Sequence, residues 1–186
     1  THLSLCDECR ARAESFDAVG GVLLDDGPTD VAMDARSLAD TMEMIKQGTP
    51  RPRVQEPAPC NVLPAPLSAY AGGDLSKVKW RSVGMGVKQA ILATSPEATA
   101  RLLYIPAGAA VPDHGHRGME LTMVLQGAFS DEVDRFGRGD VEIADEDLEH
   151  MPVADIGEDC ICLAVTDAPL RFNSLMPRLF QPFFRI

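Results

Sequence analysis

The chain has 186 residues, and 28 acidic against 17 basic side chains give it a formal charge of −11 and a pI near 4.7. This balance argues against a protein that binds nucleic acid directly, because attraction to phosphate needs a basic surface. No run of about 18 apolar residues is present, so we expect no membrane-spanning helix. We also expect no secretory signal in these residues, since a basic start followed by an apolar run is missing.

Cysteines and histidines are scarce. The five cysteines are odd in number and thinly spread, which favours a reducing cytoplasm over a disulfide scaffold. Two pairs are closely spaced, and such spacing indicates metal or redox chemistry. Cys60 stands alone in a proline-rich stretch and is interpreted as an incidental thiol. The four histidines are His2, His114, His116 and His150.

Residues 1–48 are predicted to be helical and carry four basic and ten acidic side chains. Apolar residues recur at three- and four-residue steps over 9–24, which predicts a first helix. A second helix is predicted over 35–47, with Leu38, Met42 and Ile45 on one face. Asp34 is placed to cap this helix and Gly48 to end it.

Residues 49–66 contain six of the fourteen prolines. Proline disrupts both helices and central strands, so this stretch is predicted to be a semi-rigid extended linker between two domains.

Residues 67–186 have the sequence pattern of an all-β domain. Short strand-like runs alternate with turn signals every 8 to 12 residues, which predicts an antiparallel sandwich or barrel. The predicted strands cover residues 78–83, 87–93, 98–105, 120–125, 141–144, 160–165 and 170–173.

The first candidate site is the segment HLSLCDEC, which contains His2, Cys6 and Cys9. On a helix, His2 and Cys6 lie one turn apart on the same face, and the Cys-x-x-Cys turn brings a second sulfur to the same point. Thiolate and imidazole ligands favour Zn²⁺, which takes four protein ligands in structural sites, and three are visible here. The alternative is two surface thiols beside a chance histidine.

The second candidate site lies in GAAVPDHGHRGMELTMVLQG, which holds His114, His116 and Glu120. Two histidines separated by one residue on a strand point to the same face. With His150 they would form a site of three histidines and one carboxylate inside a barrel, suited to Zn, Fe, Mn or Ni. The alternative is that these residues simply line a polar turn at the barrel mouth.

Cys160 and Cys162 alternate on a predicted strand and share one face. The default expectation for them is core packing. The functional alternative is a redox-sensing pair near the metal, although two cysteines in this relation are poorly placed for an unstrained disulfide.

The second segment resembles the first cupin motif at every position: Gly108, His114, His116, Glu120 and Gly127. Gly139 and His150 resemble the second cupin motif, which the chain departs from at Asp145, Asp147 and Ala154. This resemblance implies a jelly-roll β-barrel with a metal site.

HLSLCDEC in turn resembles the His-x-x-x-Cys-x-x-Cys core of zinc-binding anti-sigma domains. In those domains a further histidine lies on an upstream helix, so the resemblance implies that the fourth ligand here would be a histidine outside this sequence. A zinc motif, a proline-rich linker and a cupin together resemble the ChrR-type anti-sigma factors over essentially the whole chain. The ending RFNSLMPRLFQPFFRI strengthens the likeness.

The resemblance implies a cytoplasmic transcription regulator that is not an enzyme. Its helical zinc domain would hold an extracytoplasmic-function sigma factor, and its cupin, with a second zinc ion, would respond to singlet oxygen or related oxidants. The competing hypothesis is a cupin metalloenzyme, a dioxygenase or isomerase, with the helices as a docking appendage. A sensory cupin that binds an oxidised small molecule is compatible with the first hypothesis.

Overall fold

The computed structural model describes residues 1–27, 34–48, 62–95 and 97–172. Cys60 and the ending from residue 173 onward lie outside these ranges. The chain divides into two compact units, one formed by Asp7–Glu56 and the other by Thr1–Cys6 together with Pro57–Ile186. Sequence reasoning placed the division at a linker over 49–66 and assigned the first six residues to the helical part.

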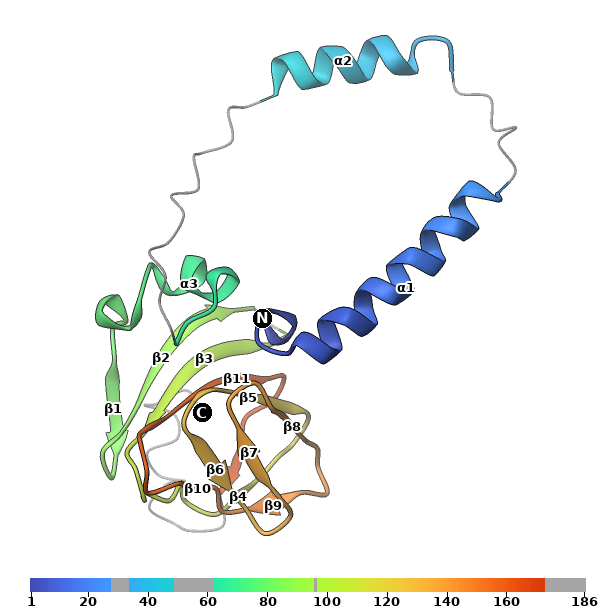
Figure 1. Cartoon of the computed structure of the whole chain (residues 1–186). Helices are drawn as coiled ribbons and strands as arrows, with labels where there is room; N and C mark the ends of the chain where they lie inside the picture. Colours follow the sequence, from blue (N-terminus) through green and yellow to red (C-terminus); the bar gives the residue numbers. More distant parts are fainter. Residues whose placement is uncertain (28–33, 49–61, 96, 173–186) are drawn as a thin grey trace. The chain divides into compact units, whose positions relative to one another are not determined.

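The smaller unit contains two helices, α1 (Asp7–Asp25) and α2 (Ser37–Gln47), close to the predicted ranges (Figure 1). Neither helix has a buried residue. The α2 helix ends at Gly48 as expected, but its N-cap residue is Arg36. Asp34 instead accepts a hydrogen bond of 2.8 Å from the backbone N–H of Arg36, so it stabilises the turn before the helix.

In the larger unit, a helix lies before the first β-strand, where sequence analysis predicted none. α3 (Ala65–Ala71) starts inside the predicted linker and contains Pro66 in its first turn. Proline is tolerated there, because the first N–H groups of a helix have no intrahelical partner. Leu63 and Leu67 are buried, which ties this end of the predicted linker to the β-domain.

The larger unit is built on a six-stranded antiparallel sheet in the order β1-β2-β3-β11-β5-β8. The strands are β1 (Arg81–Gly84), β2 (Val87–Thr94), β3 (Thr99–Ile105), β5 (Glu120–Gln126), β8 (Val141–Ala144) and β11 (Cys160–Thr166). All six were predicted to within a few residues. Side chains alternate between the two faces of the sheet, and each face contributes to an apolar core.

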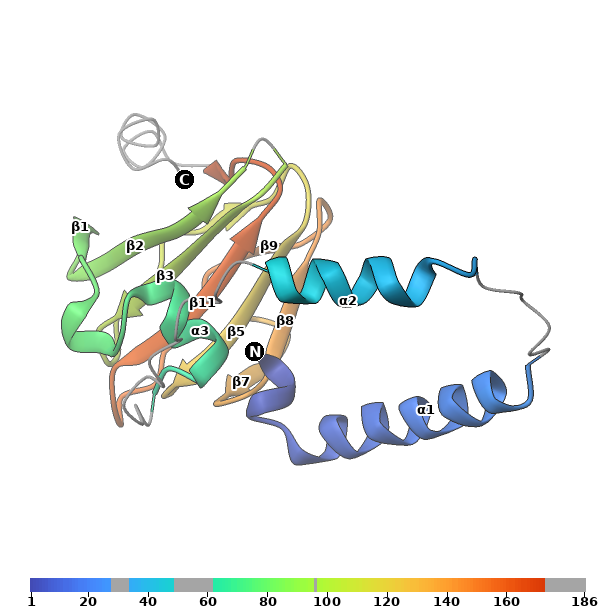
Figure 2. The ribbon, with the colours of Figure 1, turned by 90° about the horizontal axis from the view of Figure 1, so that it is seen from above.

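One face of the sheet packs against α3, which Figure 2 shows over β3 and β11. This core includes Leu67 from the helix with Leu102, Met123 and Ile161 from the sheet. The other face holds a second core, which includes Ile105, Val124 and Phe129. The helix and the barrel wall therefore cover opposite sides of the same strands.

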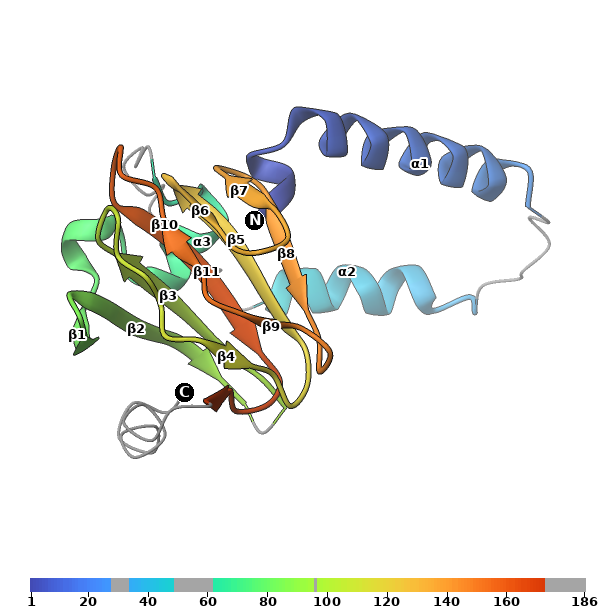
Figure 3. The ribbon, with the colours of Figure 1, turned by 90° about the horizontal axis from the view of Figure 1, so that it is seen from below.

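Two small three-stranded sheets, β10-β6-β7 and β12-β4-β9, complete the barrel on the second face (Figure 3). Their strands are β4 (His114–Gly115), β6 (Ala128–Ser130), β7 (Arg135–Gly137), β9 (Glu149–His150), β10 (Val153–Ala154) and β12 (Arg171–Phe172). Only β12 lies in a predicted strand. Pieces of two or three residues carry too little alternation to be recognised from sequence.

Gly127, the closing glycine of the first cupin motif, has a structural reason to be glycine. Its φ is +70°, and an added Cβ would lie 2.8 Å from the carbonyl oxygen of Asp159. The position therefore needs both the left-handed conformation and the missing side chain.

Among the described helices, none is both long enough and apolar enough to cross a membrane.

Candidate metal centres

Pairing of β4 with β9 brings the histidines of the two cupin-like motifs together. His114 is directly opposite His150 in this pair, and His116 follows β4 by one residue. All three histidines are buried. One ring nitrogen from each lies within 4.8 Å of the other two. The Nε2 atoms of His116 and His150 are 3.3 Å apart.

The hydrogen bonds around these rings leave nitrogens available for a metal ion. Nδ1 of His114 lies 2.8 Å from the carbonyl oxygen of Pro112, which can only accept, so the proton is on Nδ1 and Nε2 keeps its lone pair. Nδ1 of His150 is hydrogen-bonded to Asp131 at 3.1 Å, so the Nε2 of His150 also keeps its lone pair. Nδ1 of His116 is buried without a hydrogen-bond partner. These residues fit a metal ion bound by imidazole nitrogens.

The pKa values of two of these histidines favour the neutral form that binds metals. Burial is the main cause, helped by the neighbouring His150, and it lowers the pKa of both His114 and His116 to about 4. Burial would also lower the pKa of His150, but the carboxylates of Glu142 and Asp131 outweigh it and raise that pKa.

Glu120, the predicted carboxylate ligand, lies beside the three histidines rather than among them. Its Oε2 is 3.8 Å from Nδ1 of His116, and its Oε1 accepts a 2.9 Å hydrogen bond from the Thr122 hydroxyl. Burial raises the pKa of this carboxyl, although Thr122 and Arg101 oppose the shift. The role of Glu120 as a fourth ligand stays a prediction.

Two acidic residues beside His150 were missed by sequence reasoning. Asp131, just after β6, and Glu142, on β8, each place a carboxylate oxygen 3.1 Å from Nδ1 of His150. Burial raises the pKa of Glu142, whereas hydrogen bonds from the backbone N–H groups of Asp134 and Val133 outweigh burial and hold the pKa of Asp131 at about 2. An ionised Asp131 therefore accepts the His150 proton. The one available signal was Glu142 itself, a charged residue at an inward position of a predicted strand.

A cavity of about 360 Å³ adjoins this cluster inside the barrel. Its walls include His114, His150 and Glu120, but most of its lining is apolar. Cys162 also lines the cavity, and its sulfur lies 3.5 Å from that of Cys160, with both side chains buried. Contact with Cys160 and burial raise the pKa of Cys162, so this thiol stays protonated at neutral pH.

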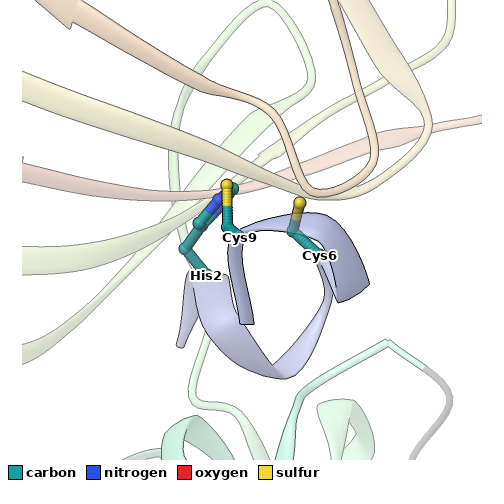
Figure 4. Close-up of side chains that lie close together, drawn as sticks. All are labelled: His2, Cys6 and Cys9. Carbon is teal, nitrogen blue, oxygen red and sulfur yellow. The ribbon is translucent and has the colours of Figure 1, made fainter. Parts of the chain in front are cut away.

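The first candidate site also comes together. His2 lies in the short helix η1 (His2–Ser4), Cys6 one residue before α1, and Cys9 in the first turn of α1. The three offer ligand atoms within 4.8 Å of one another (Figure 4). Nδ1 of His2 lies 2.8 Å from the carbonyl oxygen of Gly139 and must donate to it. Its Nε2 therefore keeps a lone pair, and the donor set of one imidazole and two thiols suits Zn²⁺.

The double layer of strands, closed by short sheets over an internal histidine cluster, places the β-domain among the cupins. Residues 69–169 match the model of the ChrR cupin-like domain. The chain is 61% identical to the anti-sigma-E factor ChrR of Cereibacter sphaeroides, over all of this chain and 86% of that protein. It also resembles the crystal structure of Rhodobacter sphaeroides SigE in complex with the anti-sigma ChrR, at 59% identity and a TM-score of 0.72, covering 90% of this chain and 84% of that one.

The chain therefore belongs to the ChrR family. The family and the fold class of helices followed by a cupin barrel are confirmed as predicted from the motifs.

Proposed function

We propose that this protein is an anti-sigma factor, a regulator rather than an enzyme, that sequesters an extracytoplasmic-function sigma factor in the cytoplasm. The main support for this proposal is the 61% identity to an anti-sigma factor along the whole chain, because it covers both the helices and the cupin. The relative's crystal structure is a complex with SigE. Direct contact with nucleic acid is not part of the proposal.

The helices have the surface that such a partner needs. The α1 helix exposes Phe16, Val22 and Leu23, and α2 exposes Leu38 and Ile45. Apolar side chains that remain exposed along two helices mark a protein interface. Zinc bound by His2, Cys6 and Cys9 would stabilise the start of α1 for this interaction.

The cupin would act as the sensor. We propose that it holds a second metal ion, zinc in the simplest case, through His114, His116, His150 and Glu120, and that it responds to singlet oxygen or a related oxidant. Cys160 and Cys162 are the candidate redox pair. Because Cys162 is buried on the cavity wall, an oxidant would have to enter the cavity to reach it, and its raised pKa makes the thiol a slow nucleophile.

Co-purification of the full-length protein with its sigma factor tests the binding role. We expect a one-to-one complex that dissociates on chelation and is weakened by Cys6→Ser or Cys9→Ser. Ser4→Ala, an exposed residue of the same segment, is the matched control and should bind fully. Undiminished sigma binding by both cysteine variants would refute the zinc-dependent mechanism.

The cavity beside the histidine cluster favours one alternative, a cupin metalloenzyme. A metal ion with open coordination positions can bind O₂ or a chelating substrate. Elemental analysis separates the two functions. Zinc in both sites supports the regulator, whereas iron in the cupin with measurable oxygen consumption supports the enzyme.

A further inference from the structure

The inner face of the large sheet is polar at one end. The strand register forms one row of four residues across β3, β11, β5 and β8. In this order they are Arg101, Ala164, Thr122 and Glu142, each paired with the next. Directly paired residues point to the same face, and all four line the cavity. The metal-site histidines His114 and His150 line the same cavity.

The opposite end of the same face is apolar. Two residues further along β3, Leu103 is opposite Cys162, and two further again Ile105 is opposite Cys160. Phe129 of β6 closes the cavity over these rows together with Val87. The cavity thus grades from a charged end to an end suited to hydrocarbon.

Arg101 is the unusual member of the polar end. The residue is only 5% exposed, and its Nη1 donates to the amide oxygen of Gln89 at 3.3 Å. Its Nε is buried without a hydrogen-bond partner, and within the described part of the chain no carboxylate lies within ion-pairing distance of its guanidinium. Glu120 attracts it only from farther away.

A buried guanidinium with unmet donors is costly unless an anion pairs with it. A carboxylate matches the guanidinium fork and can accept two hydrogen bonds at once. If Glu120 ligates a metal ion, its charge is taken up there, and the need for a second anion at Arg101 increases.

We propose that this cavity binds a small monocarboxylate with an unbranched apolar body, its carboxylate on Arg101 and its chain along Leu103 and Ile105. The size agrees: at roughly 30 Å³ for each water-sized group, a cavity of about 360 Å³ holds about twelve non-hydrogen atoms. A fatty acid of eight to ten carbons fits this limit. The proposal deepens the sensor role proposed for the cupin by naming the chemical class of ligand that its cavity takes.

Calorimetric titration of the metal-loaded, full-length protein with octanoate and with 1-octanol tests the proposal. Both probes have the same chain, so their difference isolates the carboxylate. We expect octanoate to bind at least ten-fold more tightly than octanol. Equal affinities for the two would overturn the proposal without any variant being needed.

Arg101→Met should abolish the preference for octanoate while leaving octanol binding in place. Lys88→Met removes a cation from the neighbouring strand, where Lys88 lies over the Tyr104 ring, and should keep the preference. If Arg101→Met does not fold, Arg101→Lys serves instead, and weakening of octanoate binding by at least three-fold is expected. Octanoate binding that survives either Arg101 variant but disappears on metal removal would assign the carboxylate to the metal and overturn the proposal.

Sigma-factor binding is measured separately in the same preparations. A protein that binds octanoate through Arg101 but no sigma factor would refute the proposed function alone. A protein that holds the sigma factor but does not distinguish octanoate from octanol would refute the ligand proposal alone.

Discussion

His150 is held on both of its ring nitrogens. Nε2 faces His116 at 3.3 Å, and the Nδ1 proton goes to Asp131 at 3.1 Å, with Glu142 at the same distance from that nitrogen. A carboxylate behind a ligating histidine fixes the tautomer and the orientation of the ring. If His150 binds a metal ion as proposed, the two acidic residues act as positioning residues for that ligand.

Asp131→Asn and Glu142→Gln should weaken metal binding in the cupin by about 10- to 100-fold, the range typical of residues that orient a ligand. Competition with a chromophoric chelator measures this affinity. Asp155→Asn, which breaks the surface pair of Asp155 with Arg135, is the control and should leave the affinity unchanged. Unaltered affinity in both test variants would show that His150 needs no carboxylate behind it.

The metal-free protein should lose stability as the pH falls from about 6.5 to 4. The folded pKa values of His114 and His116 are about 4, against about 6.5 in the unfolded chain, so the unfolded state takes up protons first. Each shift corresponds to on the order of 3 kcal/mol once the pH is below both values. The raised pKa of His150 acts in the opposite direction and offsets part of the loss.

Denaturant unfolding of the chelated protein at several pH values measures this dependence. The metal-free double variant His114→Gln, His116→Gln is the reference, because it keeps the remaining ionisable groups. The stability difference between the two proteins should shrink toward acid pH. A difference that stays constant from pH 7 to pH 4 would contradict the buried, neutral state of the two rings.

The residues around the cupin cavity differ in how well they could be predicted from the sequence. His114, His116 and His150 stand at motif spacings, and the structure brings them together as expected. Glu142 and Arg101 lie on separate strands and share one face only through the register of β3, β11, β5 and β8, and Asp131 reaches His150 from the turn after β6. No local pattern reveals either arrangement. Glu120 also stands at the motif spacing, and its carboxylate lies 3.8 Å from Nδ1 of His116, so its role as a ligand stays a prediction.

At the scale of elements, length decided what could be predicted. Strands of four or more residues are long enough to be recognised by their apolar residues and by the turn signals around them, whereas the two-residue strands β4 and β9 form only because tertiary pairing holds them. α3 was missed because a proline-rich sequence was taken to forbid a helix, although Pro66 occupies a permitted position in the first turn.

The α2 helix has an apolar stripe on its surface. Leu38, Met42 and Ile45 are all exposed, and α2 buries no residue. Such a stripe can either contact the sigma factor or pack within the small domain. Neither α1 nor α2 buries a residue within the small unit, which favours the first role.

The double variant Leu38→Ser, Ile45→Ser should therefore weaken sigma binding by at least ten-fold and change the thermal midpoint of the isolated protein by no more than about 2 °C. Binding can be followed by surface plasmon resonance and stability by calorimetry. Thr41→Ser, on the same helix, is the conservative control. A large fall in the thermal midpoint with unchanged sigma binding would assign the stripe to internal packing instead.

At the scale of the whole molecule, the charge of −11 is shared between the parts. Residues 1–50 contribute ten acidic and four basic side chains, and residues 67–186 contribute 17 acidic and 11 basic ones. The acidic excess is thus spread over both the helical segment and the cupin. For a sigma factor with a basic surface, such a partner is attractive from a distance before any contact is made.

Electrostatic attraction of this kind raises the association rate more than it slows dissociation. We expect the association rate constant with the sigma factor to fall about ten-fold or more between roughly 20 mM and 500 mM salt, because the Debye length shrinks to a few ångströms. The dissociation rate constant should change far less if, as proposed, the complex buries the exposed apolar side chains of α1 and α2. Stopped-flow measurements at a series of salt concentrations separate the two rate constants. A salt dependence confined to the dissociation rate constant would show that the charges act within the formed interface and not during the encounter of the two proteins.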